Sequence, residues 1–199
     1  FPFDGPLSRS VHLAALLTAV QRPILPTAPA FAWNSYSAGS GKSYAAKAVA
    51  WLTGVSPSES PWSSDGEEQR KRMMAMLLSS SASTILDNIN GKLESDSLCS
   101  LLTGEYYQDR ILGLSQNRTL PTNILILATG NNIQVAGDLC RRVLIATIDH
   151  GVEKPSRLSF AFNPVALAKE NWRVYRAAAL TLLKGFVNAG MPSYAEGSI

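Results

Sequence analysis

The sequence predicts an α/β fold in which helices flank a mostly parallel central sheet. Short apolar segments alternate along the chain with segments whose apolar residues recur every three or four positions, and this alternation favours parallel strand pairing. The run ILILA at residues 124–128 is apolar throughout, as is typical of a strand covered on both faces. Ligands of such sheets bind at the carboxyl ends of the strands. The polar residues that follow each apolar run are therefore the candidate site.

Each expected element has its own signal. Strands are expected where apolar runs are bounded by turn residues, at 30–35, 83–87, 124–128 and 143–148. Helices are expected where apolar residues step by three and four, at 8–20, 42–53, 67–80, 95–103 and 163–186. Asn163 followed by Pro164 is a typical helix start. Prolines within 22–29 predict an extended connector, and the Ser- and Pro-rich residues 56–66 predict a loop.

Length and composition indicate one globular domain with a helical appendage. The 199 residues are 46% hydrophobic and 17% charged, which is typical of a folded, globular chain. We expect an N-terminal helix and Pro-rich connector at 1–29, a core at 30–158, and a C-terminal helical segment at 159–199 that is incomplete in this sequence.

Charge and cysteine usage bear on the partners and the compartment. The net charge of +3 permits nucleic-acid binding but does not argue for it. Cys99 and Cys140 have neither metal-ligand spacing nor the pattern of a disulfide framework, so a reduced, cytoplasmic protein is expected. No apolar stretch approaches the roughly 20 residues that span a bilayer, and we expect no membrane partner.

A glycine-rich segment lies between the first expected strand and the helix that follows it. It reads Gly-Ser-Gly-Lys-Ser and ends at Lys42 and Ser43. Glycines let backbone N–H groups turn toward a phosphate, the lysine reaches the β- and γ-phosphates, and the serine hydroxyl holds Mg²⁺. The usual pattern begins with a further glycine, and Tyr36 replaces it here. The alternative is an ordinary Gly/Ser turn before a lysine. The predicted nucleotide-binding residues are Ala38, Gly39, Ser40, Gly41, Lys42, Ser43 and Tyr44.

A carboxylate closes the second expected strand. Asp87 follows the apolar run at 83–86, and an aspartate in this position can hold Mg²⁺ through water. The alternative is an aspartate that only begins a turn. Asn88 stands where many ATPases carry a glutamate that orients the attacking water. Either the base lies elsewhere, with Glu67 and Glu68 as candidates, or hydrolysis is weak.

Two further polar groups follow in the order that an oligomeric ATPase requires. Asn131, and after it Asn132, ends the third expected strand, where an amide can sense a γ-phosphate. Arg141 and Arg142 follow, and an arginine supplied by a neighbouring subunit can stabilise charge on a transferring phosphate. The alternatives are an Asn-rich turn and a pair of solvated arginines. The sequence does not decide between Arg141 and Arg142.

Taken together, these segments resemble the P-loop ATPase modules, of AAA+ type, in phage and prophage primase–helicase proteins. The resemblance covers residues 30–192. It is carried by GSGKS at 39–43, Glu67 with Lys71, ILDN at 85–88, LLTG at 101–104, DRILG at 109–113, ATGNN at 128–132, DLCRR at 138–142 and EKP at 153–155. It implies a three-layer P-loop sandwich and an ATP-driven motor that acts on single-stranded or forked DNA. It also implies a ring oligomer, such as a hexamer, with ATP between subunits.

The expected reaction is hydrolysis of Mg·ATP, with Lys42, Asp87, Asn131 and one of the two arginines as catalytic residues. Ser43 and Asp87 are the expected Mg²⁺ ligands, and a hairpin within 106–123 is the expected DNA contact. Two alternatives stay open: a nucleotide-dependent switch or scaffold with little turnover, which the Asn88 position favours, and a small-molecule or nucleotide kinase.

Overall fold

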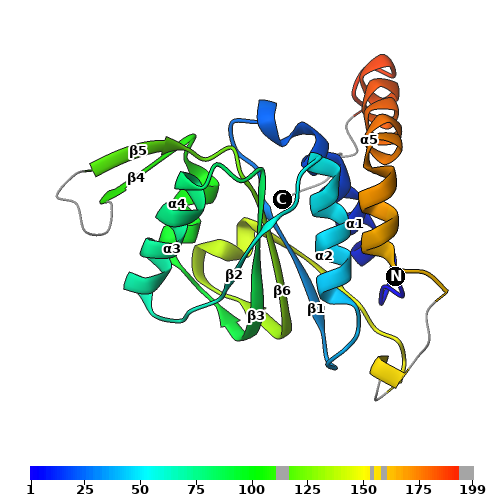
Figure 1. Cartoon of the computed structure of the whole chain (residues 1–199), viewed down its shortest axis with the longest axis horizontal. Coiled ribbons are helices and arrows are strands. Elements are labelled where there is room, and N and C mark those ends of the chain that lie inside the picture. The colour runs from blue at the N-terminus through cyan, green and yellow to red at the C-terminus, as the bar shows by residue number, and fades with distance from the viewer. Residues whose placement is uncertain (111–116, 153–154, 158–160, 193–199) are drawn as a thin grey trace.

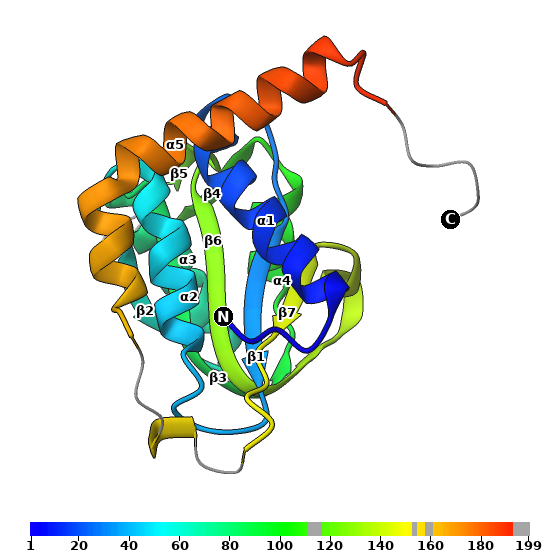
Figure 2. The same cartoon turned by 90° about the vertical axis from the view of Figure 1, so that its right-hand side faces the viewer.

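A computed structural model of the chain describes residues 1–110, 117–152, 155–157 and 161–192. Its centre is a five-stranded sheet in which every neighbouring pair is parallel, in the order β2-β3-β6-β1-β7. The strands are β1 Ala30–Ser35, β2 Ser58–Pro61, β3 Ser83–Leu93, β6 Leu125–Val135 and β7 Val143–Thr147. Helices cover both faces (Figures 1 and 2). The predicted α/β fold, with a mostly parallel central sheet between two layers of helices and a C-terminal helix, is confirmed.

Different helices cover the two faces of the sheet. Helices α3 (Gly66–Leu78) and α4 (Asp96–Thr103) pack on one face, and α1 (Pro6–Gln21) and α2 (Lys42–Ala50) on the other. Helix α5 (Pro164–Asn188) lies against α1 and α2 (Figure 2). Short 3-10 helices lie between these elements: η1 Arg22–Ile24, η2 Trp51–Thr53, η3 Gly137–Arg141 and η4 Pro155–Arg157.

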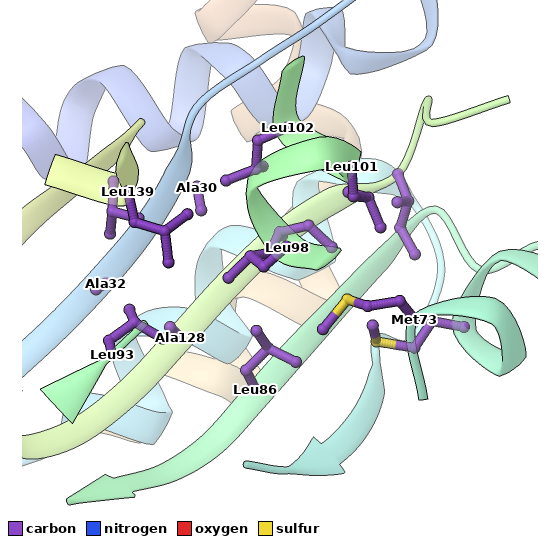
Figure 3. Close-up of a cluster of buried hydrophobic side chains, with 14 of the residues drawn as sticks. Ala30, Ala32, Met73, Leu86, Leu93, Leu98, Leu101, Leu102, Ala128 and Leu139 are labelled. Carbon is purple, nitrogen blue, oxygen red and sulfur yellow. The ribbon is translucent and has the colours of Figure 1, made fainter. Parts of the chain in front are cut away.

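The alternation of side chains in β1 explains the two hydrophobic cores. Ala30 and Ala32 face the core under α3 and α4 (Figure 3), whereas Phe31 and Trp33 face the core under α1 and α2. All four are at most 1% exposed. A strand with apolar residues on both faces is stable only between two layers of helices, so this segment sets the centre of the sandwich.

Three expectations need correction. The predicted loop at 56–66 contains β2, a short edge strand whose Ser58 hydroxyl bonds that of Thr84 in β3. Strands β3 and β6 also continue past residues 87 and 128. Polar residues interrupt the apolar pattern in both, because they sit where β3 bulges beside β6. The connector at 22–29, predicted to be extended, begins with the 3-10 helix η1. Its Arg22 is buried and donates to the backbone oxygens of Leu25, Thr122 and Ile124.

Helix α5 begins as the sequence predicts but buries little of its apolar face. Asn163 caps it by accepting from the backbone N–H groups of Val165 and Ala166. Only Ala168 and Ala179 are buried, because the second half of the helix extends past the body of the molecule (Figure 2). In the part of the chain that the structure describes, no helix is long and apolar enough to cross a membrane.

Candidate phosphate-binding site

The Gly-Ser-Gly-Lys-Ser segment forms the turn between β1 and α2, at the carboxyl end of the sheet. Gly39 and Gly41 have φ of 73° and 90°, a left-handed conformation that favours glycine. Gly41 is the N-cap of α2 and provides no side-chain hydrogen bond to it. The first N–H groups of α2 therefore remain available, and a helix N-terminus with free N–H groups is suited to a phosphate.

Lys42 is held inside this loop. Its Nζ donates to the backbone oxygen of Ser37 at 3.1 Å and to Oγ of Ser40 at 3.0 Å. Burial lowers the pKa of Lys42, and the carboxylate of Asp87 acts in the opposite direction. The Lys42 ammonium is therefore partly shielded from water, and the negative charge of Asp87 stabilises it. A bound phosphate would place further negative charge beside the ammonium.

Tyr36 occupies the position of the usual first glycine without distorting the loop. Its φ is not positive, unlike those of Gly39 and Gly41, and its side chain is 70% exposed. The backbone at this position can be adopted by any residue. Ala38 and Tyr44 are also exposed, whereas Ser43 is half-buried at the start of α2.

Asp87 lies on β3, two strands away from β1, and is bonded to the strand between them. Its Oδ1 accepts from Oγ1 of Thr129 in β6, and Thr129 is 1% exposed. Asn88 is exposed, with φ of 61°. Asparagine tolerates this left-handed conformation better than glutamate, which gives a backbone reason for the residue found there.

The two asparagines that end the polar stretch of β6 differ in their surroundings. Asn131 pairs with Ser35 of β1 and Asn90 of β3 in the sheet. Its Oδ1 is buried and has no hydrogen-bond partner among the described residues. Asn132 is exposed with φ of 51°. A buried, unpartnered amide oxygen is rare in proteins, and this distinguishes Asn131 from its exposed neighbour.

The two arginines lie at the other end of the sheet. Arg142 precedes β7, and its backbone oxygen accepts from Ala30 at the start of β1. The Gly-Ser-Gly-Lys-Ser loop follows the far end of this six-residue strand, about 17 Å away at the usual rise per residue. The Arg142 guanidinium donates to Thr103 Oγ1 at 2.8 Å and to the backbone oxygen of Asp138 at 2.7 Å. Arg141 is exposed, and its side chain has no partner among the described residues.

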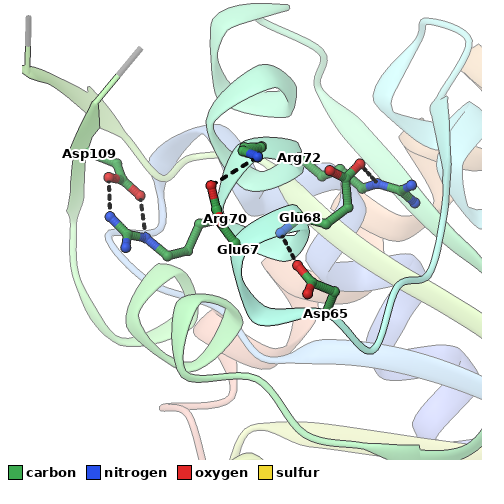
Figure 4. A network of polar contacts seen from close by, with 7 residues as sticks. Asp65, Glu67, Glu68, Arg70, Arg72 and Asp109 are labelled. Atoms are coloured by element: carbon green, nitrogen blue, oxygen red, sulfur yellow. Dashed lines mark hydrogen bonds and ion pairs between the residues drawn. The ribbon is translucent and has the colours of Figure 1, made fainter. Parts of the chain in front are cut away.

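The proposed alternative bases are engaged elsewhere. Glu67 pairs with Lys71 at 3.0 Å and Glu68 pairs with Arg72 at 2.9 Å, each one turn along α3 (Figure 4). Both carboxylates thus face cations on the surface of their own helix, which argues against either as the base. Asp87 is the carboxylate whose charge acts on Lys42.

The donor set fits magnesium better than a metal held by protein alone. The described residues contain no group of three or more His, Cys, Asp or Glu side chains suited to a metal ion. Mg²⁺ usually takes one or two protein ligands and completes its shell with water and phosphate oxygens. The Ser43 hydroxyl and the Asp87 carboxylate would supply that number.

A two-stranded hairpin, β4 (Tyr106–Arg110) with β5 (Asn117–Pro121), lies within the predicted stretch 106–123. Arg70 of α3 binds Asp109 through two hydrogen bonds of 3.0 and 2.6 Å (Figure 4). These bonds lower the pKa of Asp109, while burial raises the pKa of Tyr107 to about 12. Arg110 donates to Asp109 only through its backbone N–H. Residues 111–113 and 153–154 of the resemblance lie outside the described residues.

Sequence reasoning missed three residues that support the loop and its surroundings. Thr129 bonds Asp87, Asn34 accepts from the backbone of Ile133 at 2.9 Å, and His150 Nε2 lies 3.0 Å from the backbone oxygen of Ser40. The one signal that could have identified Asn34 is that it is the first polar residue after the apolar run at 30–33.

A scan against protein-family models and a search among curated proteins found no match. Among solved structures, the A form of the apo C-terminal region of NrS-1 is similar, with 9% identity and a TM-score of 0.54, covering 90% of this chain and 46% of that one. JCV helicase bound to a thiazolopyridine acetamide is also similar, with 14% identity and a TM-score of 0.47, covering 90% of this chain and 54% of that one. The chain thus spans about half the length of these two structures. At 9% identity, the likeness to NrS-1 shows the fold alone.

Proposed function

We propose that this chain is the ATP-hydrolysing motor domain of a helicase-type protein that acts on DNA as a ring. The observation that carries the proposal is the arrangement at the carboxyl end of the sheet. Lys42 lies within the glycine loop, Asp87 acts on its charge, and the buried Oδ1 of Asn131 has no partner among the described residues. Together these groups suit a triphosphate with Mg²⁺.

Each residue then has a definite task. Lys42 and the N–H groups of the loop would neutralise the β- and γ-phosphates, and Ser43 with Asp87 would hold Mg²⁺. When bound, Mg²⁺ neutralises charge on the phosphate oxygens. Asn131 can donate to the γ-phosphate through its amide nitrogen. Positioning of this kind supplies most of the catalysis in phosphoryl transfer.

Arg141 is the arginine that we assign to a neighbouring subunit's site. It is exposed and without a described partner, whereas Arg142 is bound to Thr103 and to the backbone of Asp138. Both lie at the end of the sheet opposite the phosphate loop, so neither suits the nucleotide of its own chain. A head-to-tail ring would bring such a surface to the next subunit's nucleotide.

The hairpin supplies a surface for DNA. Arg110 and Arg118 are exposed on β4 and β5, and the Arg70–Asp109 pair fixes β4 to α3. Arginines on a projecting hairpin suit contacts with successive phosphates of a single strand. The binding of DNA is therefore expected to weaken as salt increases.

Turnover of ATP, measured with and without single-stranded DNA, tests the proposal. We expect Mg²⁺-dependent hydrolysis that DNA accelerates, together with an increase in solution mass on addition of ATP. Hydrolysis that DNA leaves unchanged, from a chain that stays monomeric with ATP, would contradict the motor.

A second candidate function is a nucleotide-dependent switch with little turnover. Asn88 in its left-handed conformation favours it, because the position next to Asp87 then lacks the carboxylate that usually orients water. ATP binding and assembly without release of phosphate, in the presence of DNA, would support this function instead of the motor.

A further inference from the structure

Asn34 is a buried polar residue at the point where β1 turns into the phosphate loop. It is 7% exposed and follows four apolar residues of the strand. Burying an amide side chain is costly unless it forms hydrogen bonds. Its presence at the centre of the sheet, two residues before Tyr36, therefore calls for a physical reason.

The hydrogen bonds of Asn34 connect it to both neighbouring strands. Its backbone oxygen accepts from the N–H of Ile148, which follows β7, at 2.9 Å. Its side-chain Oδ1 accepts from the N–H of Ile133 in β6, also at 2.9 Å. The backbone pairing of β1 with β6 ends at Ser35 and Asn131, so the Asn34 side chain extends the contact two residues further along β6.

That contact determines the path of the backbone around Asn131. Between Asn131 and Ile133 the chain bends through Asn132, whose φ is 51°. On the other side, Gly130 lies so close to β3 that an added Cβ would come 2.1 Å from the backbone oxygen of Ile89. Asn131 is thus held between a close approach to β3 and the Asn34 bond.

The Asn131 side chain has no bond at Oδ1 that would orient it, so its direction depends on this backbone path. We infer that Asn34 is a positioning residue that couples the phosphate loop to Asn131. This inference rests on the proposed function, because it requires that Asn131 act on the γ-phosphate or the attacking water. Asn34 itself does not touch the nucleotide in this role.

The test is a double-mutant cycle of Asn34→Ala and Asn131→Ala, with kcat and nucleotide affinity measured separately. Loss of an outer partner of a functional side chain typically costs about 10- to 100-fold. We expect Asn34→Ala to lower kcat by about 10-fold in the parent chain and by less than about 2-fold in the Asn131→Ala background. The affinity for a non-hydrolysable ATP analogue should stay within about 2-fold in the same cycle.

Two further variants separate positioning from stability. Ser95→Ala removes the same kind of bond, a buried side-chain oxygen that accepts from the backbone N–H of Leu98 at 3.1 Å, but at the N-cap of α4, which packs on the opposite face of the sheet from α2. It should leave kcat unchanged. Asn34→Asp keeps an acceptor oxygen. It should retain kcat at saturating ATP while binding ATP more weakly, because of its added charge, and it replaces Asn34→Ala if that variant does not fold.

Several outcomes would overturn the inference. They are an unchanged kcat in Asn34→Ala, an equal loss of kcat in both backgrounds, an equal loss in Ser95→Ala, or a loss of kcat in Asn34→Asp as large as in Asn131→Ala. If the parent chain binds ATP but neither it nor Asn131→Ala releases phosphate, the proposed hydrolysis fails, and the coupling fails with it. If Asn131→Ala alone lowers kcat, the hydrolysis stands and only the role of Asn34 is refuted.

Discussion

The two ends of the central sheet present their charged side chains in opposite ways. At the carboxyl end, Lys42 and Asp87 are each held by hydrogen bonds to neighbouring residues, and Thr129 behind them is buried. At the amino end, Arg141 extends into solvent with no partner among the described residues. A group that is already held can act without being rearranged, whereas an exposed arginine gains its geometry only from a partner. The difference supports a catalytic site divided between subunits.

The largest expected effect comes from substituting Lys42 at the carboxyl end and Arg141 at the amino end in separate chains, and then mixing the two variants. Lys42→Met and Arg141→Ala should each lower kcat by about 10³-fold, the lower limit for an arginine supplied in trans. An equimolar mixture should recover about a quarter of the parent activity, because in a head-to-tail ring one interface in four combines an intact Lys42 with an intact Arg141.

Arg142→Ala is the matched control. Because Arg142 is bound within its own chain, its loss should change turnover much less than the loss of Arg141. Mixtures that stay inactive, although both variants assemble, would show that the two ends do not meet in one site.

A substitution at Thr129 tests whether Asp87, at the carboxyl end of the sheet, needs its hydrogen bond to β6. Thr129→Val keeps the shape of this buried side chain but removes the bond to Asp87 Oδ1. Loss of such a supporting bond should lower kcat by about 10- to 100-fold and raise the Mg²⁺ concentration that half-saturates turnover. Titration of the ATPase with Mg²⁺ measures both quantities.

The hydroxyl is restored in Thr129→Ser, which should behave like the parent chain. If Thr129→Val and the parent have the same Mg²⁺ requirement, Asp87 needs no support from β6 and the contrast between the two ends is weaker than proposed.

The sequence predicted the apolar strands of the sheet better than its edge strand β2 and the ends of β3 and β6. The apolar strands at 30–35 and 143–148 were recognisable because layers of helices on both faces require continuous apolar runs. The edge strand β2 was missed because it is short and polar, and the ends of β3 and β6 because bulged positions carry polar residues. Local patterns report burial, and these segments are only partly buried.

The candidate site shows the same division. Lys42 and Ser43 lie in a contiguous motif, so their placement followed from the local sequence. Thr129 and Asn34 act on partners that are 42 and 99 residues distant in the chain, and no local pattern reports such pairs. The position of the arginines at the opposite end follows only once the register of β1 with β7 is known.

His12 supports the strand that leads into the Gly-Ser-Gly-Lys-Ser loop, and its protonation should weaken that support. Its Nδ1 accepts from the indole N–H of Trp33 in β1 at 3.2 Å. Burial, and secondly the charge of the chain N-terminus, lower the pKa of His12 to about 4. Because the unfolded chain binds this proton more readily, the stabilisation is present above pH 6.5 and is lost as the pH falls toward 4.

We expect this residue to account for a loss of about 3 kcal/mol in the free energy of unfolding between pH 7 and pH 4. Urea unfolding at a series of pH values measures it. His12→Asn is the control, because its amide oxygen can accept from Trp33 without titrating. Equal pH dependence in the parent and in His12→Asn would assign the loss to other groups.

The smallest effect is expected at Tyr36, within the same loop. Its φ is not positive and its side chain is 70% exposed, so Tyr36→Gly restores the usual motif without relieving any strain. The added backbone freedom should cost about 0.5–1 kcal/mol of stability, with ATP affinity within about 2-fold of the parent chain.

At Gly41, where φ is 90°, the reverse change Gly41→Ala should strain the loop and weaken ATP binding far more. Calorimetric titration with ATP and GTP compares the two variants. A change of about 10-fold in the preference of Tyr36→Gly between these nucleotides would mean that the Tyr36 ring contacts the nucleotide. This exposed side chain would then be part of the binding site at the carboxyl end of the sheet.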